Sequence, residues 1–199
     1  MKTVTAVCNA ALLIVDMQND FVLPDAVASV AGARATIPII VALREHARDH
    51  LWPVIHVVRE HRADGSDVEY TRRDLFLDGG GICVAGTFGT RIVSELAPRP
   101  GEYIVIKQRF SAFLGTELDL LLRRLRIGTM VVAGTQYPNC IRATAVDALA
   151  RDYRVMVVTD ACSARSRRVA VNNIEDMRNM GITCLAFHEL ITHSTESAT

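Results

Sequence analysis

Short runs of apolar residues alternate along this chain with stretches in which apolar residues recur at the spacing of a helix. The runs are nearly continuous in Val, Ile, Leu and Met, whereas a strand with one solvated face alternates apolar and polar residues. We therefore predict strands that are covered on both faces, as in a parallel sheet. The expected strands are residues 11–15, 54–58, 103–106, 130–133, 155–159 and 183–187.

Helices are predicted between these strands, at residues 36–50, 117–126, 140–151 and 167–180. Thr116 is a candidate N-cap for the second helix, and Gly181 follows the end of the fourth. The repeated strand–helix order predicts an α/β fold, namely a three-layer α/β/α domain with a six-stranded, mainly parallel sheet and right-handed connections.

Residues 59–101 interrupt this rhythm, because the segment is long, rich in glycine and without a clear strand. Loops of this length in a compact domain are usually either functional or disordered. Its aromatic and apolar residues favour an ordered loop region that forms one wall of a pocket. No linker, repeat or low-complexity tract divides the chain, so we expect a single domain over residues 1–199 with its core at about residues 10–190.

Composition narrows the choice of function. Lys plus Arg equals Asp plus Glu at 22 each, so no net charge would attract nucleic acid or an anionic membrane surface. The apolar runs are far shorter than the roughly 20 residues of a membrane span, and the N-terminus does not resemble a secretory signal. The five cysteines are scattered without a C-x-x-C pair, which argues against disulfides and thiolate zinc sites. We expect a cytoplasmic protein that binds neither nucleic acid nor membranes.

Three ionisable side chains come after separate predicted strands: Asp16, Lys107 and Cys140. Ligands of α/β sheets bind beyond the carboxyl ends of the strands, so these groups are expected to share one edge. Cys140 also begins a predicted helix, where free amide groups and the helix dipole are expected to lower the pKa of a thiol. Cys184 lies inside an apolar strand and Cys162 follows another strand, which makes both weaker candidates.

Position alone also allows structural roles for these residues. Asp16 could accept hydrogen bonds in a turn, and Lys107 could be a surface charge or a salt-bridge partner. The surrounding motifs add to the argument. LLIVDMQNDF at residues 12–21, VIKQRFSAF at 105–113, a segment at 134–148 ending in CIRATAVDA, and DACSA at 160–164 resemble motifs of the isochorismatase-like cysteine hydrolases. The resemblance covers about residues 10–187 and implies the Rossmann-like, isochorismatase-like fold of that superfamily.

By this resemblance Asp16, Lys107 and Cys140 form a catalytic triad, with Cys140 as nucleophile and Asp16 as base. It further implies a cis peptide bond between Thr135 and Gln136, and an oxyanion hole made by the backbone amides of Gln136 and Cys140. The implied activity is hydrolysis of the C–N bond of a small linear amide or a carbamoyl or ureido compound, through a thioester and with release of ammonia or amine. A nicotinamidase and a non-catalytic α/β binding protein are the alternatives.

The nicotinamidases of the superfamily that this chain resembles carry an Asp-x-His metal pair after the second strand. This sequence has Arg59, Glu60 and His61 at the matching place. Arginine does not bind metals, and one His with one Glu is a poor ligand set. We therefore predict no metal and no cofactor. A small-molecule amide is the expected partner, and the resemblance implies a homo-oligomer, either a dimer or a tetramer.

Substrate-binding residues are predicted from their places beside these motifs. Three aromatic side chains are expected to form walls of the pocket: Phe21, Phe113 and Tyr137. Four basic side chains are candidates to pair with a carboxylate or ureido group: Arg59, His61, Arg109 and Arg142. A structural salt bridge is an equally good role for any single one of these arginines.

Overall fold

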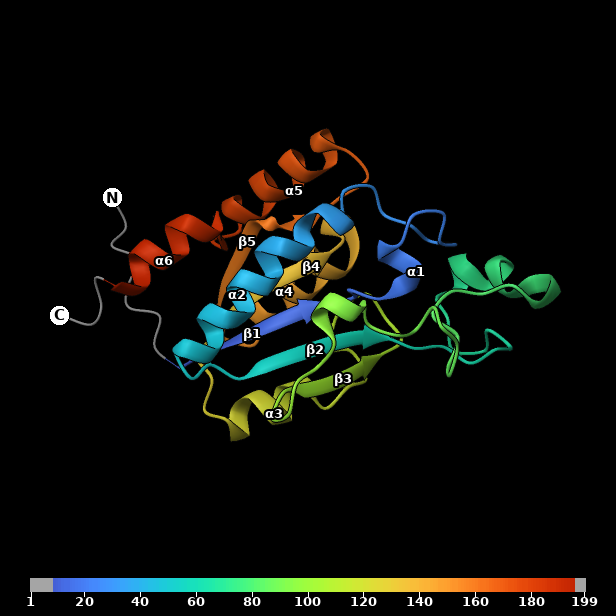
Figure 1. Cartoon of the computed structure of the whole chain (residues 1–199), viewed down its shortest axis with the longest axis horizontal. Coiled ribbons are helices and arrows are strands. Elements are labelled where there is room, and N and C mark those ends of the chain that lie inside the picture. Colours follow the sequence, from blue (N-terminus) through green and yellow to red (C-terminus); the bar gives the residue numbers. More distant parts are fainter. Residues whose placement is uncertain (1–8, 196–199) are drawn as a thin grey trace.

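The computed structural model describes residues 9–195, which form one six-stranded sheet with helices on both faces (Figure 1). All strands are parallel, where the sequence predicted a mainly parallel sheet, and their order is β3-β2-β1-β4-β5-β6. The strands are β1 (Ala10–Val15), β2 (Val54–Arg59), β3 (Tyr103–Lys107), β4 (Thr129–Thr135), β5 (Arg154–Ser163) and β6 (Thr183–Leu185). Cys8 and residues 196–199 lie outside the described range.

Four helices correspond to the predicted ones: α2 (Ile37–Asp49), α3 (Leu118–Arg124), α4 (Arg142–Leu149) and α5 (Arg167–Asn179). Two were not predicted, α1 (Asn19–Val22) and α6 (Phe187–Thr195). Short 3-10 turns occur at η1 (Arg34–Thr36), η2 (Tyr70–Gly79) and η3 (Ser94–Leu96), and a π-helical turn, η4 (Tyr137–Ile141), leads into α4. Across residues 9–195 the helices are too short or too polar to cross a membrane.

β1 shows why the strands are apolar throughout. Leu12 and Ile14 point to one face of the sheet and pack in a cluster with residues of α2 and α6. Leu13 and Val15 point to the other face and pack with residues of α3, α4 and α5. Because successive side chains of a strand point to opposite faces, a strand between two helical layers needs an apolar residue at every position.

β3 departs from the expectation that both faces of every strand are covered. It lies at the edge of the sheet, and Tyr103, Ile104 and Ile106 are exposed whereas Val105 and Lys107 are buried. An edge strand has one neighbour instead of two, so fewer helices cover it. The apolar run predicted the strand correctly and its burial wrongly.

The order of the strands creates a crevice between β1 and β4. The chain proceeds from β1 outward to β3 on one side, and from β4 outward to β6 on the other. Ligand sites of open α/β sheets form where the strand order reverses, beyond the carboxyl ends of the two central strands. Asp16 directly follows β1, and η4 with Cys140 follows β4, so both lie at this crevice.

β1 and β4 approach each other closely at that end. Gly134 has a φ of 121°, and a Cβ atom on it would lie 2.1 Å from the carbonyl oxygen of Val15. Only glycine tolerates both the backbone angle and the contact. This close packing determines how near the loop after β4 comes to Asp16.

The polar end of the first motif holds the long segment of residues 59–101 in place. The Gln18 side-chain amide donates a hydrogen bond to the carbonyl oxygen of Thr90 at 2.8 Å. The Asp20 carboxylate accepts one from the backbone amide of Cys83 at 2.7 Å. The motif therefore orders this segment as well as supplying Asp16.

Candidate active site

Lys107 brings the three predicted catalytic groups together. Its ammonium nitrogen lies 2.8 Å from Oδ2 of Asp16 and 3.4 Å from Sγ of Cys140, and it also donates to the carbonyl oxygen of Arg109 at 3.2 Å. The exposed fractions of Asp16, Lys107 and Cys140 are 1%, 0% and 5%. A buried charge needs a partner, and the ion pair of Lys107 with Asp16 supplies it.

Asp16 adopts a left-handed backbone conformation with a φ of 53°, which Asp tolerates better than most residues. Its amide donates to the carbonyl oxygen of Val57 at 2.8 Å, which ties the turn to β2. Oδ2 bonds Lys107, whereas Oδ1 is buried and has no hydrogen-bond partner among the described residues. This free oxygen is suited to accept a proton.

Cys140 lies in the π-helical turn η4, so the helical segment begins before the predicted residue 140. Burial raises the pKa of the Cys140 thiol, the negative charge of Asp16 raises it further, and Lys107 and Arg59 act in the opposite direction. The sequence predicted a lowered pKa, whereas the net direction is upward, because loss of water around the sulfur is the largest effect. The resting group is a thiol beside a carboxylate.

Arg59, at the end of β2, is fully buried next to the nucleophile. Its Nη2 lies 3.6 Å from Sγ of Cys140, and its Nη1 donates to both carboxylate oxygens of Glu69 at 2.9 and 3.1 Å. Burial by itself lowers the pKa of Arg59, but the sulfur of Cys140 when it is ionised, together with the carboxylates of Asp16 and Glu69, raises it above its ordinary value. The group therefore stays a cation at the thiol.

A small cavity of about 210 Å³ opens in front of the thiol. It is lined by Asp16, Phe21, Val30, Arg72, Thr135, Gln136, Asn139 and Cys140. The peptide bond between Thr135 and Gln136 is cis, at the position that the resemblance implied. The cavity is narrow, and one edge of it is formed by the Cys140 thiol and the Asp16 carboxylate.

An isochorismatase domain model matches residues 10–189 of the chain. The chain belongs to the isochorismatase family of cysteine hydrolases. It is 61% identical to a crystallised isochorismatase family protein from Desulfovibrio vulgaris, with a TM-score of 0.91 over 92% of this chain and 97% of that one.

Two curated relatives of this isochorismatase-family protein have informative names. A probable inactive nicotinamidase from Arabidopsis thaliana is 41% identical over 91% of this chain and 94% of its own length. The maleamate amidohydrolase of Pseudomonas putida is 33% identical over 78% of this chain and 72% of its own length. Relatives with such different names place the chain in the family and leave its substrate open.

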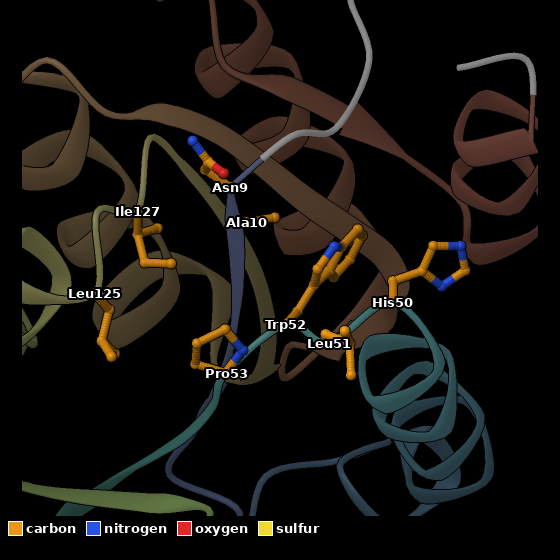
Figure 2. A pocket seen from close by; sticks show the side chains of 8 residues that line it. All are labelled: Asn9, Ala10, His50, Leu51, Trp52, Pro53, Leu125 and Ile127. Carbon is orange, nitrogen blue, oxygen red and sulfur yellow. The ribbon is translucent and has the colours of Figure 1, made fainter. Parts of the chain in front are cut away.

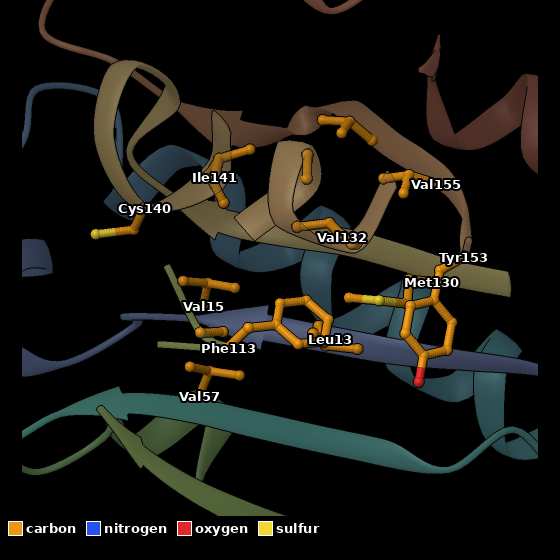
Figure 3. Close-up of a cluster of buried hydrophobic side chains, with 14 of the residues drawn as sticks. Leu13, Val15, Val57, Phe113, Met130, Val132, Cys140, Ile141, Tyr153 and Val155 are labelled. Carbon is orange, nitrogen blue, oxygen red and sulfur yellow. The ribbon is translucent and has the colours of Figure 1, made fainter. Parts of the chain in front are cut away.

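Two of the aromatic residues predicted for the pocket belong instead to the core of this family member. Phe113 packs among Leu13, Met130 and Tyr153, away from the side to which the Cys140 thiol points (Figure 3). Tyr137 is fully buried in the same cluster, and its hydroxyl donates to the carbonyl oxygen of Thr159. Phe21 alone of the three lines the cavity. Position beside a motif does not show which face of a helix or loop carries the side chain.

Two predicted basic residues have structural roles outside the cavity. Arg142 forms an ion pair with Asp176 of α5 at 3.0 Å, which links α4 to α5 at the surface. The Arg109 side chain donates to the backbone carbonyl of Asp67 and so fastens that loop. Arg109 reaches the site only through its own carbonyl oxygen, which binds Lys107.

His61 is buried behind Arg59 and does not line the cavity. Its Nδ1 lies 3.4 Å from a carboxylate oxygen of Asp67, and its Nε2 lies 3.4 Å from Nη1 of Arg59. Burial lowers the pKa of His61, and the adjacent Arg59 lowers it further. Within the described part of the chain, His, Cys, Asp and Glu side chains form no cluster that would hold a metal ion.

The sequence prediction missed five residues that shape the site. Val30, Arg72 and Asn139 line the cavity, and Glu69 pairs with Arg59. Gln18 binds the backbone of Arg59. Its Nε2 donates a hydrogen bond to the Arg59 carbonyl oxygen, and its Oε1 accepts one from the Arg59 amide, each at 2.7 Å. A weak signal existed for two of them, because Glu69 and Arg72 are three residues apart in the loop segment.

The remaining described cysteines are buried and free, namely Cys83, Cys162 and Cys184. Cys162 lies inside β5 rather than after a strand, and its thiol donates to the carbonyl oxygen of Val132 at 3.8 Å. Burial raises the pKa of Cys184 to about 11. These thiols are packing residues.

A second hollow, of about 840 Å³, lies at the opposite end of β1 (Figure 2). It is open and is lined by Asn9, Ala10, His50, Leu51, Trp52, Pro53, Leu125 and Ile127. Its wall includes no carboxylate, lysine or arginine, so it lacks the chemistry that surrounds Cys140. The smaller cavity is therefore the candidate active site.

Proposed function

We propose that this protein is a cysteine amidohydrolase that cleaves the C–N bond of a small linear amide or of a carbamoyl or ureido compound. One observation carries the proposal. Lys107 contacts both Asp16 and Cys140, while the second oxygen of Asp16 is buried without a partner. A thiol, an ammonium and a carboxylate in this arrangement form a nucleophile, its orienting cation and its base.

In the first half of the reaction, Asp16 accepts the thiol proton as Cys140 attacks the substrate carbonyl carbon. Lys107 and Arg59 stabilise the thiolate, since both contact its sulfur. The backbone amides of Gln136 and Cys140 are assigned as donors to the oxyanion, which is supported by the place of both residues in the cavity wall. A raised thiol pKa suits this step, because the proton leaves only when a base is beside it.

In the second half, protonated Asp16 gives its proton to the leaving nitrogen, and ammonia or amine departs from the tetrahedral intermediate. The products are a thioester on Cys140 and a free Asp16 carboxylate. Asp16 then takes a proton from water, which attacks the thioester carbonyl. Collapse of this second intermediate releases the carboxylic acid, and the proton on Asp16 returns to the sulfur.

Arg59 bears on the alternative of a nicotinamidase. It occupies the position where the sequence comparison expects the aspartate of a metal pair, and its guanidinium lies at the thiol. Arginine at that position supplies no metal ligand. The Arabidopsis relative named a probable inactive nicotinamidase still makes nicotinamide a necessary test compound.

The test is release of ammonia from a panel of small amides, ureides and nicotinamide. Wild type and Cys184→Ala, which removes a buried thiol outside the site, should both release ammonia from at least one compound. Cys140→Ala should release none while keeping its far-ultraviolet circular dichroism spectrum. Turnover by Cys140→Ala would refute the nucleophile. A wild-type protein that is folded and hydrolyses nothing would favour the non-catalytic binding protein. Assembly into a dimer or tetramer stays a prediction.

A further inference from the structure

Two of the three cations near the cavity bind protein groups and do not line it. Lys107 binds Asp16 and the carbonyl oxygen of Arg109. Arg59 binds both oxygens of Glu69 and contacts the thiol through its other terminal nitrogen. Neither side chain belongs to the lining of the cavity. They act on the nucleophile and are not free to bind a distant part of a substrate.

Arg72 is the third cation, and it lines the cavity. It comes from η2, in the long segment that Gln18 and Asp20 hold against β1. Its guanidinium carbon lies 4.8 Å from the centre of the Phe110 ring, and its Nε lies 3.8 Å from an oxygen of Glu69.

The Nη1 atom of Arg72 is buried and has no hydrogen-bond partner among the described residues. Buried guanidinium nitrogens almost always have an acceptor. The Nε atoms of Arg44 and Arg59 also lack a partner, but neither residue lines the cavity. At Arg72 the unpartnered nitrogen belongs to a lining residue, which fits a ligand group at this place. A carboxylate fits best, because it matches the planar donors of arginine.

The balance of charge around the cavity points the same way. Among the described residues, the cations Lys107, Arg59 and Arg72 share two carboxylate partners, Asp16 and Glu69, while the Cys140 thiol is protonated. Burial lowers the pKa of Arg72, and repulsion by Arg59 lowers it further, as expected for a group short of negative charge. One bound anion would restore neutrality.

We propose that Arg72 is the substrate-binding residue for a carboxylate, and that the substrates are small amides or carbamoyl compounds carrying one carboxylate group. This rests on the proposed hydrolase function. Phe21 and Val30 supply the apolar part of the wall, which suits a short aliphatic body between the two polar ends. With its carboxylate on Arg72, such a molecule presents its other end to Cys140.

Matched compounds test the proposal by turnover. Succinamate is compared with butyramide, and N-carbamoylglycine with ethylurea, because each neutral compound has a methyl group in place of the carboxylate. Wild type should prefer the carboxylate of each pair. Arg72→Gln should lower kcat/KM for the carboxylates roughly 10- to 100-fold more than for the neutral compounds, mainly through KM. Arg72→Lys should recover part of the loss.

Arg73→Gln is the matched control, since Arg73 is the adjacent arginine of η2, is exposed and does not line the cavity. It should behave as wild type with both members of each pair. Equal effects of Arg72→Gln on charged and neutral compounds would overturn the carboxylate subsite. Efficient hydrolysis of butyramide by wild type, with no preference for succinamate, would overturn it while leaving the hydrolase function intact.

A second measurement does not depend on turnover. Iodoacetate and iodoacetamide alkylate the same sulfur and differ by one carboxylate, so their rates at Cys140 are measured by mass spectrometry and divided by their rates with free 2-mercaptoethanol. Wild type and Arg73→Gln should prefer iodoacetate, and Arg72→Gln should lose about tenfold or more of that preference. Absence of the preference in wild type contradicts the subsite. Its presence in a protein that releases no ammonia supports the subsite and contradicts the hydrolase function.

Discussion

The Nη2 atom of Arg59 lies 3.6 Å from the Sγ atom of Cys140, so the nucleophile has a guanidinium as well as the Lys107 ammonium beside it. Gln18 fixes the backbone of Arg59, because its side chain binds both the amide and the carbonyl of that residue. Glu69 orients the guanidinium at the other end of the Arg59 side chain, because its carboxylate accepts two hydrogen bonds from Nη1. The first motif thus positions a cation from a different strand at the thiol.

Replacing Arg59 with Gln should make the thiol harder to ionise. Arg59 and Lys107 are the two cations that lower the pKa of Cys140 against the effect of burial. We expect the midpoint of the pH dependence of Cys140 alkylation by iodoacetamide to rise by about one unit. Arg62→Gln is the control, because Arg62 is exposed on the same connection and pairs with Asp64. An unchanged midpoint would show that Arg59 does not act on the sulfur.

Loss of one member of the buried ion pair should cost more stability than loss of both. Lys107→Met leaves the Asp16 carboxylate buried without its cation, and should lower the free energy of unfolding by about 3–5 kcal/mol. The double variant Asp16→Asn, Lys107→Met should be more stable than Lys107→Met alone. Urea denaturation measures both. Additive losses in the double-mutant cycle would mean that the two groups do not interact.

Gly134 should tolerate no side chain. Gly134→Ala would place Cβ within 2.1 Å of the Val15 carbonyl oxygen at a φ of 121°. The backbone angle alone costs about 1–3 kcal/mol, and the clash adds to it. Gly128→Ala, before the other end of β4, meets nothing within 4 Å and should change stability by less than about 1 kcal/mol. Thermal unfolding of the two variants compares them, and similar melting temperatures would contradict the close packing.

Acid should destabilise the fold in part through His56. Burial lowers the pKa of His56 below its ordinary value of 6.5, and the hydrogen bond that its Nε2 donates to Glu102 only partly offsets this. Below about pH 6.5 the unfolded chain therefore binds a proton that the folded protein does not, and the free energy of unfolding falls as the pH falls.

The measurement is urea denaturation at pH 7.5 and pH 5.5. His56→Gln should lose less stability than wild type between these two values, even though its stability at pH 7.5 is lower. His188→Gln, which changes an exposed histidine, should lose as much as wild type. A wild type whose stability rises on acidification would contradict the direction of the shift.

The strands were predictable because their signal is local. The apolar runs indicated all six, and each begins within one residue of its predicted start. The helices α2 to α5 followed from spacing and flanking residues in the same way. α1 has only four residues, too few to show a helical period. α6 has nine residues with an amphipathic period similar to that of α2, so its signal was present and was missed. The exposure of β3 was not predictable, since it depends on a place at the edge of the sheet that no local pattern encodes.

The catalytic residues of the site were predictable from one rule, namely that ligands of α/β sheets bind beyond the carboxyl ends of the strands. That rule placed Asp16, Lys107 and Cys140 at one edge, and the structure brings their side chains into contact. The direction of the Cys140 pKa was wrong, because a helix start is visible in a sequence and burial of a sulfur atom is not.

The sequence by itself determined the alternation of strands and helices and the set of residues delivered to one edge of the sheet, because both depend on neighbours along the chain. Only the tertiary structure decided which side chains face the cavity. It turned Phe113 and Tyr137 into the core and brought Arg59 and Arg72 toward the thiol. The reason is physical: orientation, burial and charge balance arise between segments distant in sequence, which meet only when the sheet and its long loop are packed.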